Sequence, residues 1–180
     1  MKLLFISDIH GIKTNLPFIE QLWAKGNFDY LIVLGDLYYI GPRNQMKEDY
    51  DISYVQSFLN SKKEKLICMR GNCDSNVDVE VSDFLIHPGI ERFPFDGKDV
   101  YFTHGDLYHF NACDKLPDSC ILIYGHEHVP YIKEKGNRLF LNPGSISLPR
   151  SNFFPTYMIY ENHMFTIYDI HGKIVDQRKI

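Results

Sequence analysis

The sequence predicts an α/β fold, a four-layer αββα sandwich in which two mixed β-sheets pack face to face with helices outside. In the first half of the chain, short apolar β-rich runs alternate with helical patterns, which indicates crossovers between parallel strands. In the second half, short strands follow one another with hairpin turns. Parallel strands need both faces covered, and hairpin strands can supply a facing sheet, so two packed sheets satisfy both halves.

The first half predicts three strands and two helices in alternation. We expect strands at 2–7, 30–34 and 65–69, and helices at about 15–25 and 51–60. Pro17 suits the first turn of the first helix, and Gly26 ends it. Apolar residues recur at helical spacing on one face of each helix. These residues are Leu16, Ile19, Leu22 and Trp23 in the first helix, and Tyr54, Val55, Phe58 and Leu59 in the second.

The second half predicts a run of β-strands. A Gly-Asn pair at 136–137 separates two of them and is typical of a hairpin turn. We expect strands at 100–103, 121–124, 131–135, 138–141, 157–160 and 164–170.

Composition describes one ordinary globular domain, and we expect residues 1–180 to form it. With 19 Lys and Arg against 23 Asp and Glu, the formal net charge is −4, which disfavours a nucleic-acid partner. The longest apolar run covers 30–34, far below the roughly 20 residues of a transmembrane helix, so no membrane partner is expected. The four cysteines lack CxxC spacing, which favours reduced thiols and a cytoplasmic location.

Polar side chains follow five of the predicted strands, at the point where each strand ends. Ligands of α/β proteins gather outside the carboxyl ends of strands, so these segments should meet at one edge. Each segment contains a glycine, which allows a sharp turn or close approach to an ion. In chain order the segments are Asp8-Ile9-His10-Gly11, Gly35-Asp36, Gly71-Asn72-Cys73-Asp74, His104-Gly105 and Gly125-His126-Glu127-His128.

These five segments together predict a metal site. Taken singly, a Gly-Asp pair is usually a turn and a lone histidine usually a hydrogen-bonded structural residue. Five such clusters at successive strand ends favour metal binding instead. Nitrogen and oxygen donors without a thiolate suit Mn²⁺, Fe, Ni or Zn in an open catalytic site better than a closed structural zinc site.

In these motifs the chain resembles the calcineurin-like metallophosphoesterases, whose pattern is D-x-H, G-D, G-N-H-D, H and G-H-x-H. Here the pattern reads DIH, GD, GNCD, H and GHEH, across residues 8–147. The cysteine in GNCD, with Gly-Pro-Arg-Asn at 41–44 and Asn-Pro-Gly-Ser at 142–145, looks like the small bacterial phosphodiesterase branch. The resemblance implies the fold of that family and two divalent metal ions. It assigns Asp8, His10, Asp36 and His128 to one ion, and Asp36, Asn72, His104 and His126 to the other.

The resemblance also implies a function, hydrolysis of a small organic phosphodiester by in-line attack of a metal-bridging hydroxide. A shared carboxylate, here Asp36, is what two neighbouring cations require. Two divalent ions, two aspartates and a hydroxide leave a net charge of about +1 to receive an anionic phosphate. We expect manganese, with Fe, Ni or Zn as alternatives.

Two further residues, Cys73 and Arg43, are catalytic candidates beside Asp36 and Asn72. In many relatives a histidine at the position of Cys73 is thought to protonate the leaving oxygen, and a thiol with a pKa near ~8.5 does this less well. Nearby cations would push Cys73 towards thiolate, so we expect substrates with good leaving groups, or protonation of the leaving oxygen by another residue or by water. A metal ligand or an inert residue are the other interpretations. Arg43 could grip a phosphate oxygen or form a surface salt bridge.

Two alternatives to a phosphodiesterase remain at this point. One is a phosphomonoesterase on the same site. The other is a non-catalytic protein-binding scaffold of the same fold, as in a small subunit of the retromer complex. Burying the donors without cations would be costly, which disfavours the scaffold. A homo-oligomer is compatible with the sequence.

Overall fold

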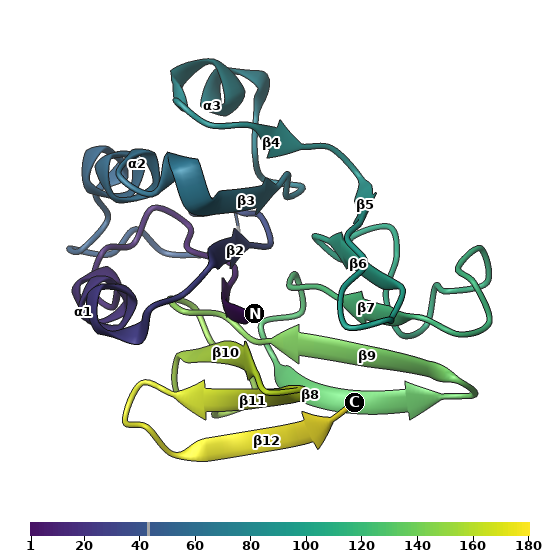
Figure 1. The fold of residues 1–180 in the computed structure, drawn as a ribbon. Coiled ribbons are helices and arrows are strands. Elements are labelled where there is room, and N and C mark those ends of the chain that lie inside the picture. Colours follow the sequence, from purple (N-terminus) through teal and green to yellow (C-terminus); the bar gives the residue numbers. More distant parts are fainter. Residues whose placement is uncertain (43) are drawn as a thin grey trace.

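Two mixed β-sheets pack face to face in the computed structural model, which describes residues 1–42 and 44–180 (Figure 1). The larger sheet has parallel pairing from β1 through β4, and antiparallel pairing from β1 through β10 and β11 to β12. In spatial order its seven strands are β12 (Ile174–Lys179), β11 (Met164–Asp169), β10 (Thr156–Glu161), β1 (Lys2–Ile6), β2 (Tyr30–Val33), β3 (Leu66–Met69) and β4 (Ile86–His87).

The smaller sheet has a parallel centre and antiparallel edges. Its strands β6, β7 and β9 run parallel, while β5 and β8 pair antiparallel at the two sides. In spatial order the five strands are β5 (Ile90–Arg92), β6 (Val100–Thr103), β7 (Ile121–Ile123), β9 (Arg138–Pro143) and β8 (Pro130–Lys135).

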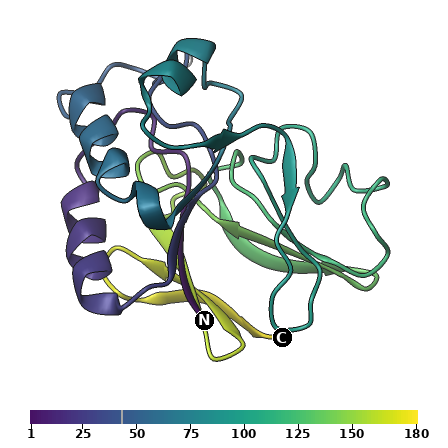
Figure 2. The same cartoon turned by 45° about the horizontal axis from the view of Figure 1, so that its top comes forward.

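The helices lie on one side of the molecule, against the larger sheet (Figure 2). The predicted amphipathic helices are α1 (Leu16–Gly26) and α2 (Ile52–Asn60), and their apolar faces pack on the outward side chains of β1, β2 and β3. Asp51 caps α2 by accepting a hydrogen bond from the backbone N–H of Tyr54. The other two helices are the short 3₁₀ helix η1 (Lys63–Lys65) and α3 (Asn76–Val81).

The main core lies between the two sheets. Side chains alternate along each strand, so Leu4 and Ile6 of β1 face the helices while Leu3 and Phe5 face the other sheet. Phe5 meets Phe102 of β6 edge to face, with ring centroids 5.7 Å apart. This packing holds the two sheets in the relative position that the loops at their ends require.

The outer face of the smaller sheet is covered by the irregular segment 104–120. Cys113 and Leu116 of this segment pack there with Leu122, Tyr124 and Phe140. The αββα fold class is confirmed, but among the described residues no helix forms this fourth layer. The segment contains Pro117 and several turn-forming Asn, Asp and Ser residues, which favour turns over a helix.

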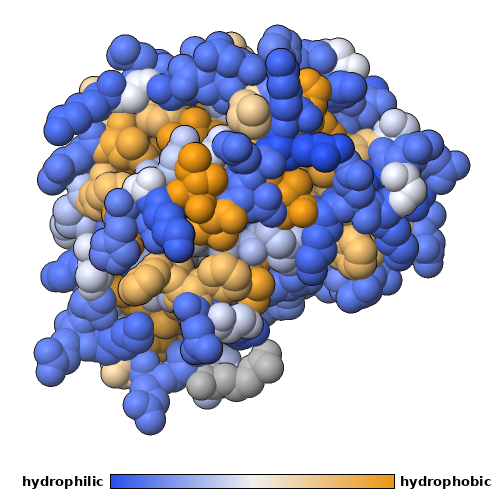
Figure 3. Space-filling view, turned by 90° about the horizontal axis from the view of Figure 1, so that it is seen from below, coloured by the Kyte–Doolittle hydropathy of each residue, from blue (hydrophilic) through white to orange (hydrophobic). Residues whose placement is uncertain are grey.

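The surface on the side of β12 is largely hydrophilic, and its apolar side chains gather in separate patches (Figure 3). Among residues 1–42 and 44–180, no helix has both the length and the apolar character needed to cross a lipid bilayer.

Replacing Phe102 by alanine tests the inter-sheet core. Phe102 is fully buried, so Phe102→Ala should lower the free energy of unfolding by about 3–5 kcal/mol through lost burial and a cavity. The matched control is Phe154→Ala, because Phe154 is 59% exposed and its loss should change stability by about 0.5 kcal/mol or less. Urea denaturation of both variants measures the difference, and equal midpoints would contradict the proposed packing.

Candidate metal centre

The five predicted donor segments meet where the carboxyl ends of strands from both sheets come together. Those from β1, β2 and β3 belong to the larger sheet, and those after β6 and β7 to the smaller. Backbone hydrogen bonds join the segments: Asp8 donates its N–H to Gly35, His10 to Asp36, and Gly125 to His104, at 3.1, 2.9 and 2.8 Å. The donors are therefore held by backbone rather than by side-chain contacts alone.

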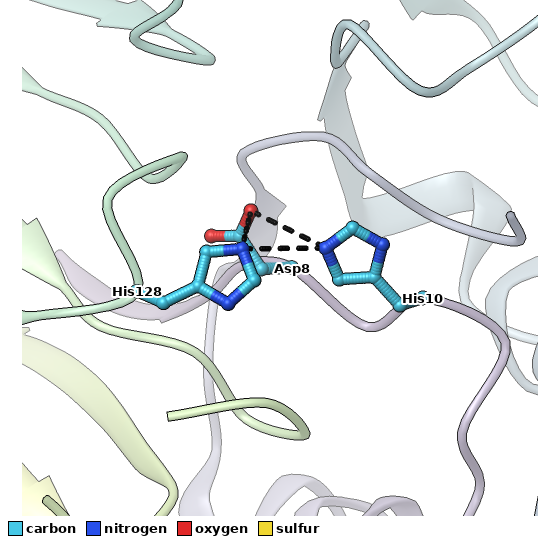
Figure 4. A group of neighbouring side chains, drawn as sticks. All are labelled: Asp8, His10 and His128. Atoms are coloured by element: carbon cyan, nitrogen blue, oxygen red, sulfur yellow. Dashed lines mark hydrogen bonds and ion pairs between the residues drawn. The ribbon is translucent and has the colours of Figure 1, made fainter. Parts of the chain in front are cut away.

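Asp8, His10 and His128 form one compact group (Figure 4). The Nε2 atoms of the two histidines lie 3.3 Å apart, and His128 Nε2 lies 3.3 Å from Asp8 Oδ1. The corresponding distance from His10 Nε2 is 4.0 Å. All three side chains are buried, so three potential ligand atoms converge where little of their surface meets bulk water.

Asp36 lies between this group and a second one. Its Oδ2 is 3.5 Å from His10 Nε2, and its Oδ1 is 3.5 Å from His104 Nε2. In the second group, His104 Nε2 lies 3.0 Å from Asn72 Oδ1 and 3.1 Å from His126 Nδ1. The two oxygens of one carboxylate thus face two different sets of nitrogen and oxygen donors, which is the arrangement expected of a bridging ligand.

Hydrogen bonds to backbone carbonyls orient three of the histidines. The Nδ1 atoms of His10, His104 and His128 each contact a carbonyl oxygen, which requires the proton to be on Nδ1. The Nε2 lone pair of each ring is then available to a metal ion, as is usual for metal-binding histidines. The carbonyls are those of Tyr39, Leu34 and Leu148, at 2.7, 2.7 and 2.6 Å.

The backbone of the site is strained at the donor residues. Left-handed conformation is uncommon outside glycine, and it costs on the order of 1–3 kcal/mol per residue. Here it occurs at five of the seven predicted ligands, with φ between 53° and 64°. These are Asp8, His10, Asp36, His126 and His128.

Two glycines allow the segments to approach closely. A Cβ on Gly35, whose φ is +95°, would lie 2.6 Å from the backbone nitrogen of Gly71 and 2.8 Å from His104 Nδ1. A Cβ on Gly71 would overlap Oδ1 of Asp36. Any larger residue at either position would push Asp36 or His104 away from its neighbours.

The surroundings of Asp8 fit a bound cation. Its Oδ1 is buried and has no hydrogen-bond partner, although a buried polar atom without a partner is costly. Burial alone would raise the pKa of Asp8, but the neighbouring imidazoles of His128, His104 and His10 hold that pKa well below its usual range. A carboxylate kept ionised beside imidazole nitrogens fits a divalent metal ion.

Asp74 holds the loops that carry Asp36 and Asn72. Its carboxylate accepts hydrogen bonds from the backbone N–H groups of Asp36, Leu37 and Gly71 at 2.9, 2.7 and 2.7 Å. Burial raises the pKa of Asp74 although these bonds act in the opposite direction. Asp74 therefore positions backbone and does not point into the site.

The Asn-Pro-Gly-Ser stretch at 142–145 is hydrogen-bonded to two of the donor segments. Asn142 donates a hydrogen bond to the carbonyl of Gly125, at 2.7 Å, and accepts one from the backbone N–H of Gly144. The Ser145 hydroxyl donates to the carbonyl of Asp8 at 2.8 Å. Both side chains are fully buried, and they fix the segments that carry Asp8 and His126.

Cys73 lies beside the donors. Its sulfur is within 4.8 Å of ligand atoms of His10 and Asp36, and its backbone N–H donates to Asp36 Oδ1 at 2.9 Å. Burial, with the charge of Asp36, raises the pKa of Cys73 to about 12. The surrounding protein groups by themselves therefore keep Cys73 a neutral thiol. The thiolate expected from the sequence would require the additional charge of the metal ions.

A cavity of about 170 Å³ opens over the donors. Arg150 lines this cavity, although sequence analysis did not single it out; its only signal was a basic residue shortly after the Asn-Pro-Gly-Ser stretch. Arg43, a predicted catalytic residue, lies outside the described residues. The lining residues are His10, Asp36, Gly41, Pro42, Asn44, Asn72, Cys73, His126, His128 and Arg150.

Comparison with known proteins identifies the family. Phosphodiesterase YfcE of Escherichia coli is 32% identical over 175 residues, which cover 97% of this chain and 95% of that protein. The solved structure of this E. coli phosphoesterase superimposes on the present one with a TM-score of 0.95, over 100% of this chain and 100% of that chain. The probable metallophosphoesterase YsnB of Bacillus subtilis is 26% identical, over 98% of this chain and 95% of that protein.

A more distant likeness concerns the fold alone. Vps29 of Cryptosporidium parvum is 21% identical, with a TM-score of 0.65 over 99% of this chain and 98% of that chain. Residues 1–163 match the calcineurin-like phosphoesterase superfamily domain. The chain therefore belongs to the calcineurin-like phosphoesterase superfamily.

Proposed function

We propose that this protein is a binuclear metal-dependent phosphodiesterase that hydrolyses a small organic phosphodiester. The observation that carries the proposal is the position of Asp36, whose two carboxylate oxygens face two separate donor groups 3.5 Å away on either side. The name of the E. coli relative, a phosphodiesterase, supports the choice of diesters.

Two divalent ions fit the donors that are present. Asp8, His10, Asp36 and His128 would hold one ion, and Asp36, Asn72, His104 and His126 the other. We propose manganese, although the same nitrogen and oxygen donors also suit Fe, Ni or Zn. When bound, such ions supply Lewis acidity, which lowers the pKa of water and offsets the charge of a phosphoryl group.

The residues of the chain prepare the site for this chemistry. The carbonyl-bonded histidines keep their Nε2 lone pairs directed inward. Asp8 and Asp36 would supply negative charge that offsets part of the charge of the cations. The cavity of about 170 Å³ is smaller than those that enclose drug-sized ligands, so a phosphoryl group fits inside while an ester group extends outward. We keep Arg43 as a proposed phosphate contact.

Cys73 bears on the leaving group. A thiol at this position lacks the imidazolium proton that a histidine would offer, so a basic alkoxide leaving group receives little assistance. Substrates with weakly basic leaving groups, such as aryl diesters, are therefore proposed.

Our proposal extends to the cellular location and the oligomeric state of the protein. We place residues 1–180 in the cytoplasm as one functional unit, supported by the free cysteines at 68, 73, 113 and 120. Exposed Val77, Val79 and Leu85 around α3 offer an apolar surface for a homo-oligomer. A scaffold without catalysis is disfavoured, because the strained and buried donor groups serve no purpose in protein binding.

Metal stoichiometry tests the bridging role of Asp36. Wild-type protein incubated with Mn²⁺ and desalted should retain two ions per chain, and Asp36→Asn should retain at most one, because the amide brings no charge between the cations. Elemental analysis gives the count. The control is Asp118→Asn, whose side chain is fully exposed and should leave the count unchanged. Two ions retained by Asp36→Asn would refute the bridging role.

Substrate preference separates the diesterase from a monoesterase. We expect the manganese-loaded protein to hydrolyse an aryl phosphodiester at least tenfold faster, in kcat/KM, than the matching aryl monoester. Colorimetric release of the same phenol measures both rates under one set of conditions. A clear preference for the monoester would overturn the proposal.

Replacing Cys73 by histidine tests the role of the missing proton donor. Cys73→His should raise the rate on a diester with an alkyl leaving group by at least tenfold, because general acid catalysis contributes roughly 10²–10⁴-fold. The rate on an aryl diester should change much less. Cys73→Ser is the matched control, since it changes the thiol without adding an imidazole. No gain on the alkyl diester would show that protonation is not limiting.

A further inference from the structure

Arg150 lines the cavity, and hydrogen bonds of its own backbone hold it there. Its N–H donates to the carbonyl of His128 at 3.0 Å, and its carbonyl accepts from the N–H of Phe153 at 3.2 Å. Between them, Ser151 and Asn152 are both left-handed, with φ of 56° and 62°. The main chain of Arg150 is therefore part of the fold, and its position beside the GHEH segment does not depend on its side chain.

The side chain of Arg150 has no such structural use. Among the described residues it forms no hydrogen bond or ion pair, and it is exposed. The four other described arginines all have partners. Arg70 bonds Asp74 and Asn76, Arg92 bonds Asp99, Arg138 bonds Asp118 and the carbonyls of Leu116 and Pro117, and Arg178 bonds Glu134.

Arg150 lines the same cavity as the donors. His126 and His128 also line this cavity, and the backbone N–H of Arg150 is bonded to the carbonyl of His128. A cation at this place adds to the attraction that metal ions exert on an anion. It does not sit opposite a carboxylate that would neutralise it, because Asp36, the acidic residue of the cavity lining, is buried among the histidines.

We propose that Arg150 is a substrate-binding residue whose guanidinium donates hydrogen bonds to the non-bridging oxygens of the phosphodiester. This inference rests on the proposed function, and it names a contact within that site. The planar guanidinium presents paired donors that match two phosphate oxygens, and it stays charged at any physiological pH. Because Arg150 lines the same cavity as Asp36 and Asn72, a phosphoryl group held over these donors would lie beside it.

Phosphate binding by manganese-loaded protein tests this role without requiring turnover. Calorimetric titration with inorganic phosphate should show that Arg150→Ala raises Kd by about 10- to 100-fold, as the loss of a charged hydrogen bond predicts. Arg150→Lys keeps the charge and loses the paired donors, so its Kd should fall between the two. The control is Arg92→Ala, which removes an exposed guanidinium paired with Asp99 and should bind phosphate like the wild type.

Two further readouts distinguish substrate binding from a structural role. The manganese content of Arg150→Ala should remain that of the wild type. With an aryl diester, KM should rise about as much as the phosphate Kd while kcat stays within threefold. Unchanged phosphate affinity, loss of bound manganese, a fall in kcat at constant KM, or a wild-type protein that binds no phosphate would each overturn the inference. Phosphate binding that depends on Arg150 without any diester hydrolysis would support the role of Arg150 and contradict the proposed function.

Discussion

The shared carboxylate of Asp36 is the constraint on which the rest of the site depends. Its two oxygens face histidines from opposite sheets, so the distance between the sheets sets the distance between the two donor groups. The inter-sheet core, in which Phe5 meets Phe102, is thus also what spaces the metal ligands. Without cations, the site would keep a buried carboxylate oxygen of Asp8 without a partner.

The backbone conformation of the donor segments lowers the stability of the fold but places the ligand atoms close together. Left-handed conformations at five predicted ligands cost free energy, and the hydrogen bonds of Asp74, Asn142 and Ser145 hold the segments in place. Metal binding would return part of that cost, because a ligand that binds only the folded chain stabilises it by mass action. The proposed metal pair would therefore explain both the strain and the unpartnered carboxylate oxygen of Asp8.

The ligand set and the cavity lining have different roles. The proposed ligands would supply the metal chemistry, whereas the residues around them would decide which phosphate ester enters and how its leaving group departs. In the proposed mechanism Cys73 bears on the leaving group and Arg150 on the phosphate oxygens.

Sequence alone determined most of the strands, the helices α1 and α2, and the donor segments. Hydrophobic periodicity and the motifs at strand ends are local signals, so they can be read from the sequence. Three strands and two short helices escaped prediction: β4, β5, η1 and α3 are too short for a periodic signal, and β12, with the sequence IVDQRK, is a polar edge strand. The irregular fourth layer, the carbonyls that orient His10, His104 and His128, and the place of Arg150 were decided by the tertiary structure. Each of them depends on contacts between segments far apart in the chain, and such contacts leave no periodic pattern in the sequence.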